Sequence, residues 1–89
     1  MRTAHVFIEG KVQGVFFRDS IKRKADALGV KGWVKNLDDG RVEAVLSGSE
    51  ENVKEMVRFC RQGPPAAEVT DVDVSYEESA EFASFKVRY

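Results

Sequence analysis

The sequence predicts an α+β sandwich, in which two helices cover one face of a mostly antiparallel β-sheet. Apolar residues alternate with period two in several short segments, and they recur at helical spacing in two longer ones. These segments follow one another in the order β-α-β-β-α-β, with one further strand segment. The 89 residues suffice for one hydrophobic core, so we expect residues 1–89 to form a single domain.

The first strand and the first helix lie on either side of the stretch "GKVQGVFFR", residues 10–18. In "AHVFIEG" the alternating residues that share one strand face are Ala4, Val6 and Ile8. In "FRDSIKRKADALG" the residues at helical spacing are Phe17, Ile21, Ala25 and Leu28. Gly29 follows them and can supply a left-handed C-terminal cap. The rest of this helix is charged, so we expect it to pack on the sheet by one side only.

A hairpin and a second helix come next. "VKGWVKN" and "GRVEAVLS" are typical of two strands, and the Asp-Gly pair in "LDDG" favours a tight turn between them. In "SEENVKEMVRFCRQ" the apolar helical stripe consists of Val53, Met56, Val57 and Cys60. Either Ser47 or Ser49 can cap this helix, and the "GPP" at residues 63–65 ends it.

Two strands complete the chain. "EVTDVDVSY" and "SFKVRY" alternate, and the residues that mark their apolar faces are Val72, Val74 and Tyr76, then Phe85, Val87 and Tyr89. Two strand–helix–strand units with right-handed crossovers give the ferredoxin-like α/β sandwich (βαββαβ), with two helices on one face of the sheet. This architecture supports many functions, so the fold alone does not choose one.

Composition narrows the class of protein. The formal net charge is −1, whereas proteins that bind nucleic acid usually carry a basic excess, so we expect no nucleic-acid partner. Cys60 is the only cysteine, which excludes an internal disulfide and a thiolate metal cage. No stretch is apolar enough for a signal peptide or a membrane span. We therefore expect a cytoplasmic protein. We also expect a monomer with no metal, no cofactor and no membrane partner.

Residues that often carry chemistry have simpler structural explanations here. Cys60 continues an apolar helical stripe, as a small core residue does. His5 lies on the strand face opposite Val6 and is expected to face solvent. Two acidic pairs fit a hairpin turn and the solvated outer face of a strand, and these are Asp38 with Asp39 and Asp71 with Asp73.

The stretch "GKVQGVFFR" is open to two interpretations, a plain crossover loop or a backbone cradle for an anion. Gly10 and Gly14 can adopt dihedral angles closed to other residues. A loop that leads from a strand into a helix can point successive N–H groups at one ligand. Arg18 adds a planar fork that matches phosphate or carboxylate oxygens. We expect the apolar residues that end the loop to anchor it in the core, and these are Val15, Phe16 and Phe17.

Asn36 is similarly ambiguous. It ends the second strand just before the hairpin, where asparagine is ordinarily a turn former. In a sandwich that places this strand beside the first crossover, its carboxamide could instead face the loop.

These two segments together resemble the acylphosphatase family. The family's first signature is complete in Ile8, Glu9 and "GKVQGVFFR". It consists of an aliphatic residue and any residue, followed by G-x-V-Q-G-V-x-F-R. The second signature is also complete, in "GWVKNLDDGRVEAVLSG". It consists of a glycine, an aromatic residue, a small residue, a basic residue and an asparagine, followed by three free positions, G-x-V, five free positions and G. The "F-x-V-R-Y" ending is also similar, so the resemblance spans essentially the whole chain.

The resemblance implies hydrolysis of small acyl phosphates to a carboxylate and inorganic phosphate, without metal. It implies that Arg18 binds phosphate and that Asn36 orients the attacking water. It further implies that the backbone amides of one loop cradle the phosphate, namely those of Gly10, Lys11, Val12, Gln13, Gly14, Val15, Phe16 and Phe17. We expect a standalone protein rather than an accessory domain of a larger maturation enzyme. The alternative function is a non-catalytic ferredoxin-like module that senses an anionic metabolite.

Overall fold

The computed structural model describes residues 1–77 and 81–88. Over these residues the chain forms β1 (Arg2–Lys11), α1 (Phe17–Leu28), β2 (Lys31–Asn36), β3 (Val42–Gly48), α2 (Glu50–Gln62), β4 (Glu68–Glu77) and β5 (Phe85–Arg88). The predicted element order is confirmed. Tyr89, which we expected to extend the last strand, lies outside the described residues.

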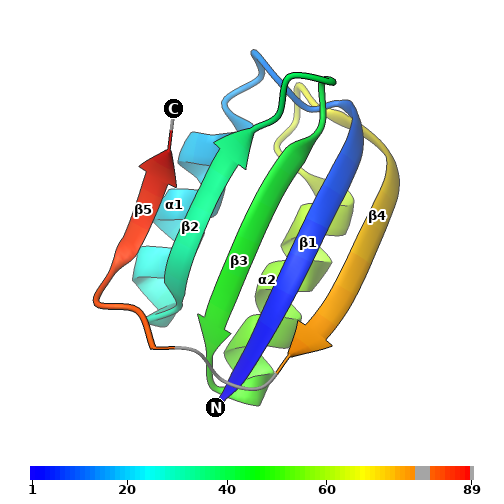
Figure 1. Cartoon of the computed structure of the whole chain (residues 1–89). Coiled ribbons are helices and arrows are strands. Elements are labelled where there is room, and N and C mark those ends of the chain that lie inside the picture. Colours follow the sequence, from blue (N-terminus) through cyan, green and yellow to red (C-terminus); the bar gives the residue numbers. More distant parts are fainter. Residues whose placement is uncertain (78–80, 89) are drawn as a thin grey trace.

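The strands form a single sheet in the order β4-β1-β3-β2-β5. β1 pairs antiparallel with both β3 and β4, β2 pairs antiparallel with β3, and β5 pairs in parallel with β2. Both helices lie on the same face of the sheet, as Figure 1 shows. This is the predicted ferredoxin-like sandwich, and it brings the β1–α1 crossover to the same end of the sheet as the β2–β3 hairpin (Figure 1).

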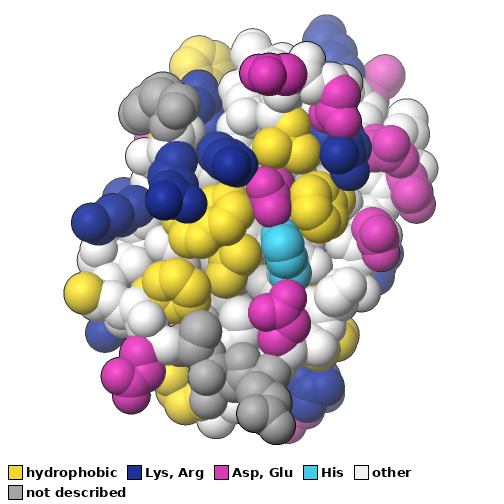
Figure 2. All heavy atoms as spheres, in the orientation of Figure 1, with side chains coloured by type: hydrophobic (Ala, Val, Ile, Leu, Met, Phe, Trp, Pro, Cys, Tyr) yellow, Lys and Arg dark blue, Asp and Glu magenta, His cyan; other side chains and the backbone are white. Residues whose placement is uncertain are grey.

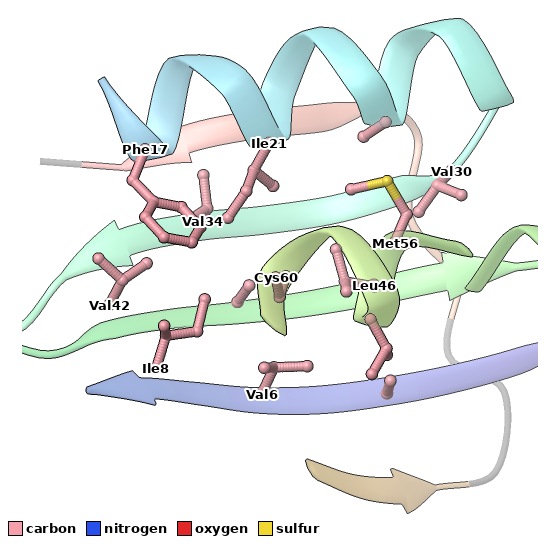
Figure 3. Packing of buried hydrophobic residues seen from close by; sticks show 14 of the residues in the cluster. Val6, Ile8, Phe17, Ile21, Val30, Val34, Val42, Leu46, Met56 and Cys60 are labelled. Carbon is pink, nitrogen blue, oxygen red and sulfur yellow. The ribbon is translucent and has the colours of Figure 1, made fainter. Parts of the chain in front are cut away.

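The hydrophobic core fills the space between the sheet and the helices. The predicted faces of β1 and of the helices are buried, with Ala4, Val6, Ile8, Ile21, Met56 and Cys60 all fully inaccessible to solvent. Figure 3 shows Phe17 and Ile21 of α1 pointing toward Val34 of β2. Burying each large apolar side chain stabilises the folded state by about 1.5–3 kcal/mol. A shift of β1 by one residue would turn its apolar side chains to the other face of the sheet, so this burial strongly specifies the register of β1.

The helix ends follow the expected cap chemistry. Gly29 adopts the left-handed conformation (φ 71°) and closes α1 through its backbone N–H. Of the two serines that could begin α2, Ser49 is the N-cap, and its side chain accepts a hydrogen bond from the N–H of Asn52. Ser47 is instead buried, where its Oγ accepts a hydrogen bond from Thr3.

No helix of the described residues covers the other face of the sheet, which is turned toward the viewer in Figure 2. His5 is half-buried at its centre, with Nε2 2.6 Å from Glu43 and Nδ1 3.5 Å from Glu77. Asp71 and Asp73 on β4 are exposed, as expected for an outer strand face. Neither helix among the described residues is long and apolar enough to cross a membrane.

Candidate active site

β1 contains an irregularity just before the β1–α1 loop. The register between β1 and β4 shifts between Glu9 and Gly10, and Gly10 has φ 125°. A Cβ atom at this glycine would lie 2.1 Å from the carbonyl oxygen of Glu68. Gly10 is therefore needed for the close approach of two strands, and β1 continues in the shifted register through Lys11.

Gly14 occupies a different environment at the tip of the loop. Its φ is 73°, yet a Cβ atom built on it would meet no atom within 4 Å. The neighbouring Val12 and Val15 are buried at 1% and 6% exposure and hold the two ends of the loop on the core. Gly14 thus serves the turn of the backbone and leaves open space beside it.

Phe16 contradicts our expectation that it anchors the loop. Val15 and Phe17 are buried as predicted, but Phe16 is 79% exposed. It is the N-cap of α1 and has φ 63° and ψ 24°, which makes it the one non-glycine residue with positive φ in the described part of the chain. This left-handed turn costs about 1–2 kcal/mol for an L-residue, and it points the Phe16 side chain away from the core that holds its neighbours.

The first turn of α1 offers backbone N–H groups to a ligand. The side chain of the N-cap residue, Phe16, makes no capping hydrogen bond, and the first residues of α1 are Phe17, Arg18 and Asp19. The first N–H groups of a helix have no partner within the helix and carry partial positive charge, so they favour an anion. Asp19 in this turn forms a 2.7 Å ion pair with Arg23, one turn further along.

Arg18 reaches from α1 to the edge strand. Its Nη1 donates a 3.1 Å hydrogen bond to the carbonyl oxygen of Arg88 on β5. This contact joins positions that are 70 residues apart in the sequence. It anchors one corner of the guanidinium group at the edge strand.

Asn36 faces the same region from β2. It lies two residues after the fully buried Val34, so its side chain projects from the helix-covered face of the sheet. Its Oδ1 atom is buried and accepts no hydrogen bond from any described residue. Buried polar atoms usually have a hydrogen-bond partner, so this oxygen is an acceptor that a bound ligand or water can use. The turn-former interpretation of Asn36 does not account for this atom.

Gln13 has a side-chain role that sequence reasoning missed. Its Nε2 donates to the carbonyl oxygens of Leu37 (2.8 Å) and Arg41 (3.0 Å). The N–H of Leu37 in turn donates a 2.8 Å hydrogen bond to the carbonyl oxygen of Arg41, which closes the β2–β3 turn. We expected only a backbone contribution from Gln13, because contacts between distant segments leave no local sequence signal.

Asp39 of the hairpin has the local role expected of it. The side chain of Asp39 accepts hydrogen bonds from the N–H and the Nε of Arg41, at 3.1 and 2.8 Å. These bonds, that from the backbone N–H foremost, lower the pKa of the Asp39 carboxyl. Cys60 also conforms to expectation, because complete burial raises the pKa of its thiol to about 12 and leaves it an inert core residue.

These elements enclose a pocket of about 290 Å³ at one end of the sandwich. Its lining comprises Val12, Gly14, Phe16, Phe17, Arg18, Asp19, Asn36 and Val87. The fold thus brings Arg18, Asn36 and part of the predicted cradle loop to a single cavity. Four of the eight predicted cradle residues do not line it, namely Gly10, Lys11, Gln13 and Val15. Asp19 and Val87 line it and were not predicted.

The fold and this pocket define a class of protein, a ferredoxin-like sandwich with a pocket between a strand, a glycine-containing loop and a helix N-terminus. Residues 4–87 match the family model of acylphosphatase. The chain belongs to the acylphosphatase family, as its two signatures implied.

Individual relatives agree with the family model over nearly the whole chain. An acylphosphatase from Trichormus variabilis is 56% identical over 84 residues, which cover 94% of this chain and 83% of that protein. One from Haloarcula marismortui is 51% identical over 86 residues, which cover 97% of this chain and 94% of the relative. The crystal structure of acylphosphatase from Bacillus subtilis superimposes with a TM-score of 0.94 at 38% identity, with 100% of both chains covered.

The protein is accordingly a hydrolase of acid anhydrides that cleaves small acyl phosphates to a carboxylate and inorganic phosphate. This activity, rather than the sensing of an anionic metabolite, is the function that the family membership supports.

Proposed function

We propose that Arg18, Asn36 and the backbone N–H groups of residues 10–17 carry out this hydrolysis. Arg18 and the N–H groups hold the phosphoryl group, and Asn36 orients the attacking water. The observation that supports this assignment is the shared pocket, which Arg18 lines from α1 and Asn36 lines from β2. Among the cradle residues, Val12, Gly14, Phe16 and Phe17 also line it.

Arg18 and the cradle act on the charge of the phosphoryl group. In a loose transition state, negative charge spreads over the phosphoryl oxygens while the bond to the carboxylate breaks. Donors that are already fixed in place stabilise this charge without reorganisation. The hydrogen bond from Arg18 to the Arg88 carbonyl fixes the guanidinium group in this way.

Asn36 acts on the water. Its Oδ1 can accept a hydrogen bond from a water molecule, and this would satisfy the one buried side-chain atom without a hydrogen-bond partner among the described residues. The water oxygen forms a bond to phosphorus, the bond between phosphorus and the carboxyl oxygen breaks, and the carboxylate leaves with the electron pair. A carboxamide is no base at neutral pH, so the proton of the water passes to an oxygen of the phosphoryl group itself.

The reaction needs no metal in this scheme, because the arginine and the N–H groups supply the positive charge. Among residues 1–77 and 81–88, no group of three or more His, Cys, Asp or Glu side chains could hold a metal ion. The carboxylate is a good leaving group, so neither a covalent nucleophile nor a strong general acid is required. We further propose that residues 1–89 form a single domain and that the protein is a cytoplasmic monomer without nucleic-acid or membrane partners. Its net charge of −1 argues against a nucleic-acid partner, and its single cysteine agrees with a reducing compartment.

A turnover assay with a chelator tests the proposal. Substoichiometric protein is mixed with excess benzoyl phosphate and a strong chelator, and loss of the anhydride absorbance is followed. We expect many turnovers per protein molecule, abolished in Arg18→Ala and kept in a matched arginine variant on α2, Arg58→Ala, whose side chain is 71% exposed. Loss of turnover with the chelator contradicts metal independence, and phosphate binding without turnover would favour the sensing module.

A further inference from the structure

Phe16 stands out because two unfavourable features coincide at one residue. Its backbone is left-handed, which phenylalanine rarely adopts, and its ring is 79% exposed to water. Asparagine or glycine would accept this backbone more easily, and a polar side chain would suit the exposure. Strained residues persist where the surrounding structure holds them, and they concentrate at active sites and ligand clamps.

Phe16 lies at the pocket where the proposed function places the substrate. The residue precedes the first turn of α1 and lines the pocket that Arg18 and Asn36 share. Two other apolar residues of the lining, Val12 and Phe17, are each 1% exposed and have almost no surface left to offer. Phe16 is therefore the most exposed apolar side chain among the residues that line this pocket, and the half-buried Val87 is the other one that keeps exposed surface.

We propose that Phe16 determines specificity at the acyl end of the substrate. This inference rests on the proposed function, in which Arg18 and the cradle hold the phosphoryl end. The acyl group must then extend from the cradle toward the opening of the pocket, where an aromatic ring provides apolar contact. An acyl phosphate with an aromatic or bulky apolar acyl group covers this ring, whereas acetyl phosphate covers little of it.

The test compares two substrates in one variant. Phe16→Asn keeps the backbone N–H and tolerates the left-handed conformation, so we expect it to fold and to melt about 4 °C higher than the parent. The measured quantity is the ratio of kcat/KM for benzoyl phosphate to that for acetyl phosphate. We expect this ratio to fall about fivefold, as for the loss of roughly 40 Å² of apolar contact. The ratio cancels any change in the cradle that both substrates share.

Two further variants make the comparison specific. Phe16→Leu keeps an apolar side chain and should retain part of the preference for benzoyl phosphate. Tyr76→Asn removes another exposed aromatic residue, 44% exposed on β4, and should leave the ratio unchanged. An unchanged ratio in Phe16→Asn, or an equal fall in Tyr76→Asn, overturns the inference.

The outcomes also separate this inference from the proposed function. If the parent hydrolyses both substrates in an Arg18-dependent manner while Phe16→Asn keeps the parental ratio, only the role of Phe16 is wrong. If Arg18→Ala and Asn36→Ala hydrolyse both substrates at the parental rate, the assignment of the pocket is wrong, and the role of Phe16 falls with it.

Discussion

The carboxamide of Gln13 binds the β2–β3 hairpin at the residue that directly follows Asn36. Its Nε2 lies 2.8 Å from the carbonyl oxygen of Leu37 and 3.0 Å from that of Arg41. Both N–H protons of one side chain are thus used to join the cradle loop to the end of β2. The two parts of the proposed site, the phosphate cradle and the water-orienting asparagine, are held together by this one residue.

Gln13→Met tests this coupling, because methionine is of similar length and donates no hydrogen bond. We expect kcat to fall roughly tenfold, since a small displacement of a positioning group is costly in the reaction, while inhibition by inorganic phosphate changes little. Steady-state kinetics with phosphate as a competitive inhibitor measure both quantities. In the Asn36→Ala background, Gln13→Met should add little further loss. A full, multiplicative loss in that background would show that Gln13 acts independently of Asn36.

Arg18→Ala is expected to impair both binding and chemistry. The guanidinium group meets the phosphoryl charge in the bound substrate and more strongly in the transition state, so kcat/KM should fall by a factor of about 10²–10³. Inhibition by inorganic phosphate should weaken as well. Arg18→Lys keeps the charge without the planar fork and should recover only part of the loss. Retention of phosphate inhibition in Arg18→Ala contradicts this assignment.

Asn36→Ala is expected to separate function from stability. Turnover should fall by about 10²-fold because the water is no longer oriented, whereas inorganic phosphate should still inhibit. Since Oδ1 of Asn36 is buried without a partner among the described residues, its removal should cost little stability, and the free energy of unfolding should stay the same or rise. Kinetics and urea denaturation of the same preparation decide the matter. A large loss of stability would indicate a structural role for Asn36.

The fold could be predicted from the sequence because an element buried on one face shows apolar residues at regular spacing, every second residue in a strand and at helical spacing in a helix. The alternation of Val6 with His5 and the helical stripe that includes Ile21 each follow from one buried face. The meeting of Arg18 and Asn36 followed from topology and from the resemblance. The burial of Phe16 was predicted wrongly. Its backbone is left-handed, and this turns its apolar side chain outward between two buried neighbours.

The contact of Gln13 could not be predicted for a different reason. It joins residues 24 and 28 positions apart, and its geometry depends on how the loop and the hairpin dock. The two loop glycines illustrate the same limit. Gly10 and Gly14 look alike in the sequence, but only the first is packed against a neighbouring strand.

Cys60 provides a pH-dependent prediction. Burial raises the pKa of its thiol from 9.0 to about 12, so the unfolded chain loses this proton at a lower pH than the native protein does. The stabilisation is present below pH 9 and is lost as the pH rises toward 12, at up to about 1.4 kcal/mol per pH unit. Urea denaturation from pH 8 upward should show a shallower decline in Cys60→Ala than in the parent. Parallel declines contradict the shift.

The two loop glycines should respond differently to alanine. In Gly10→Ala the new methyl group overlaps the Glu68 carbonyl oxygen, so we expect a loss of about 3 kcal/mol or more in the free energy of unfolding. In Gly14→Ala the methyl group meets open space, and the left-handed backbone alone should cost about 1 kcal/mol. Gly14 lines the pocket, so its variant should remain folded and bind inorganic phosphate more weakly. Urea denaturation and phosphate inhibition measure the two effects. A larger loss of stability in Gly14→Ala than in Gly10→Ala would contradict the assignment of Gly10 to strand packing and of Gly14 to ligand approach.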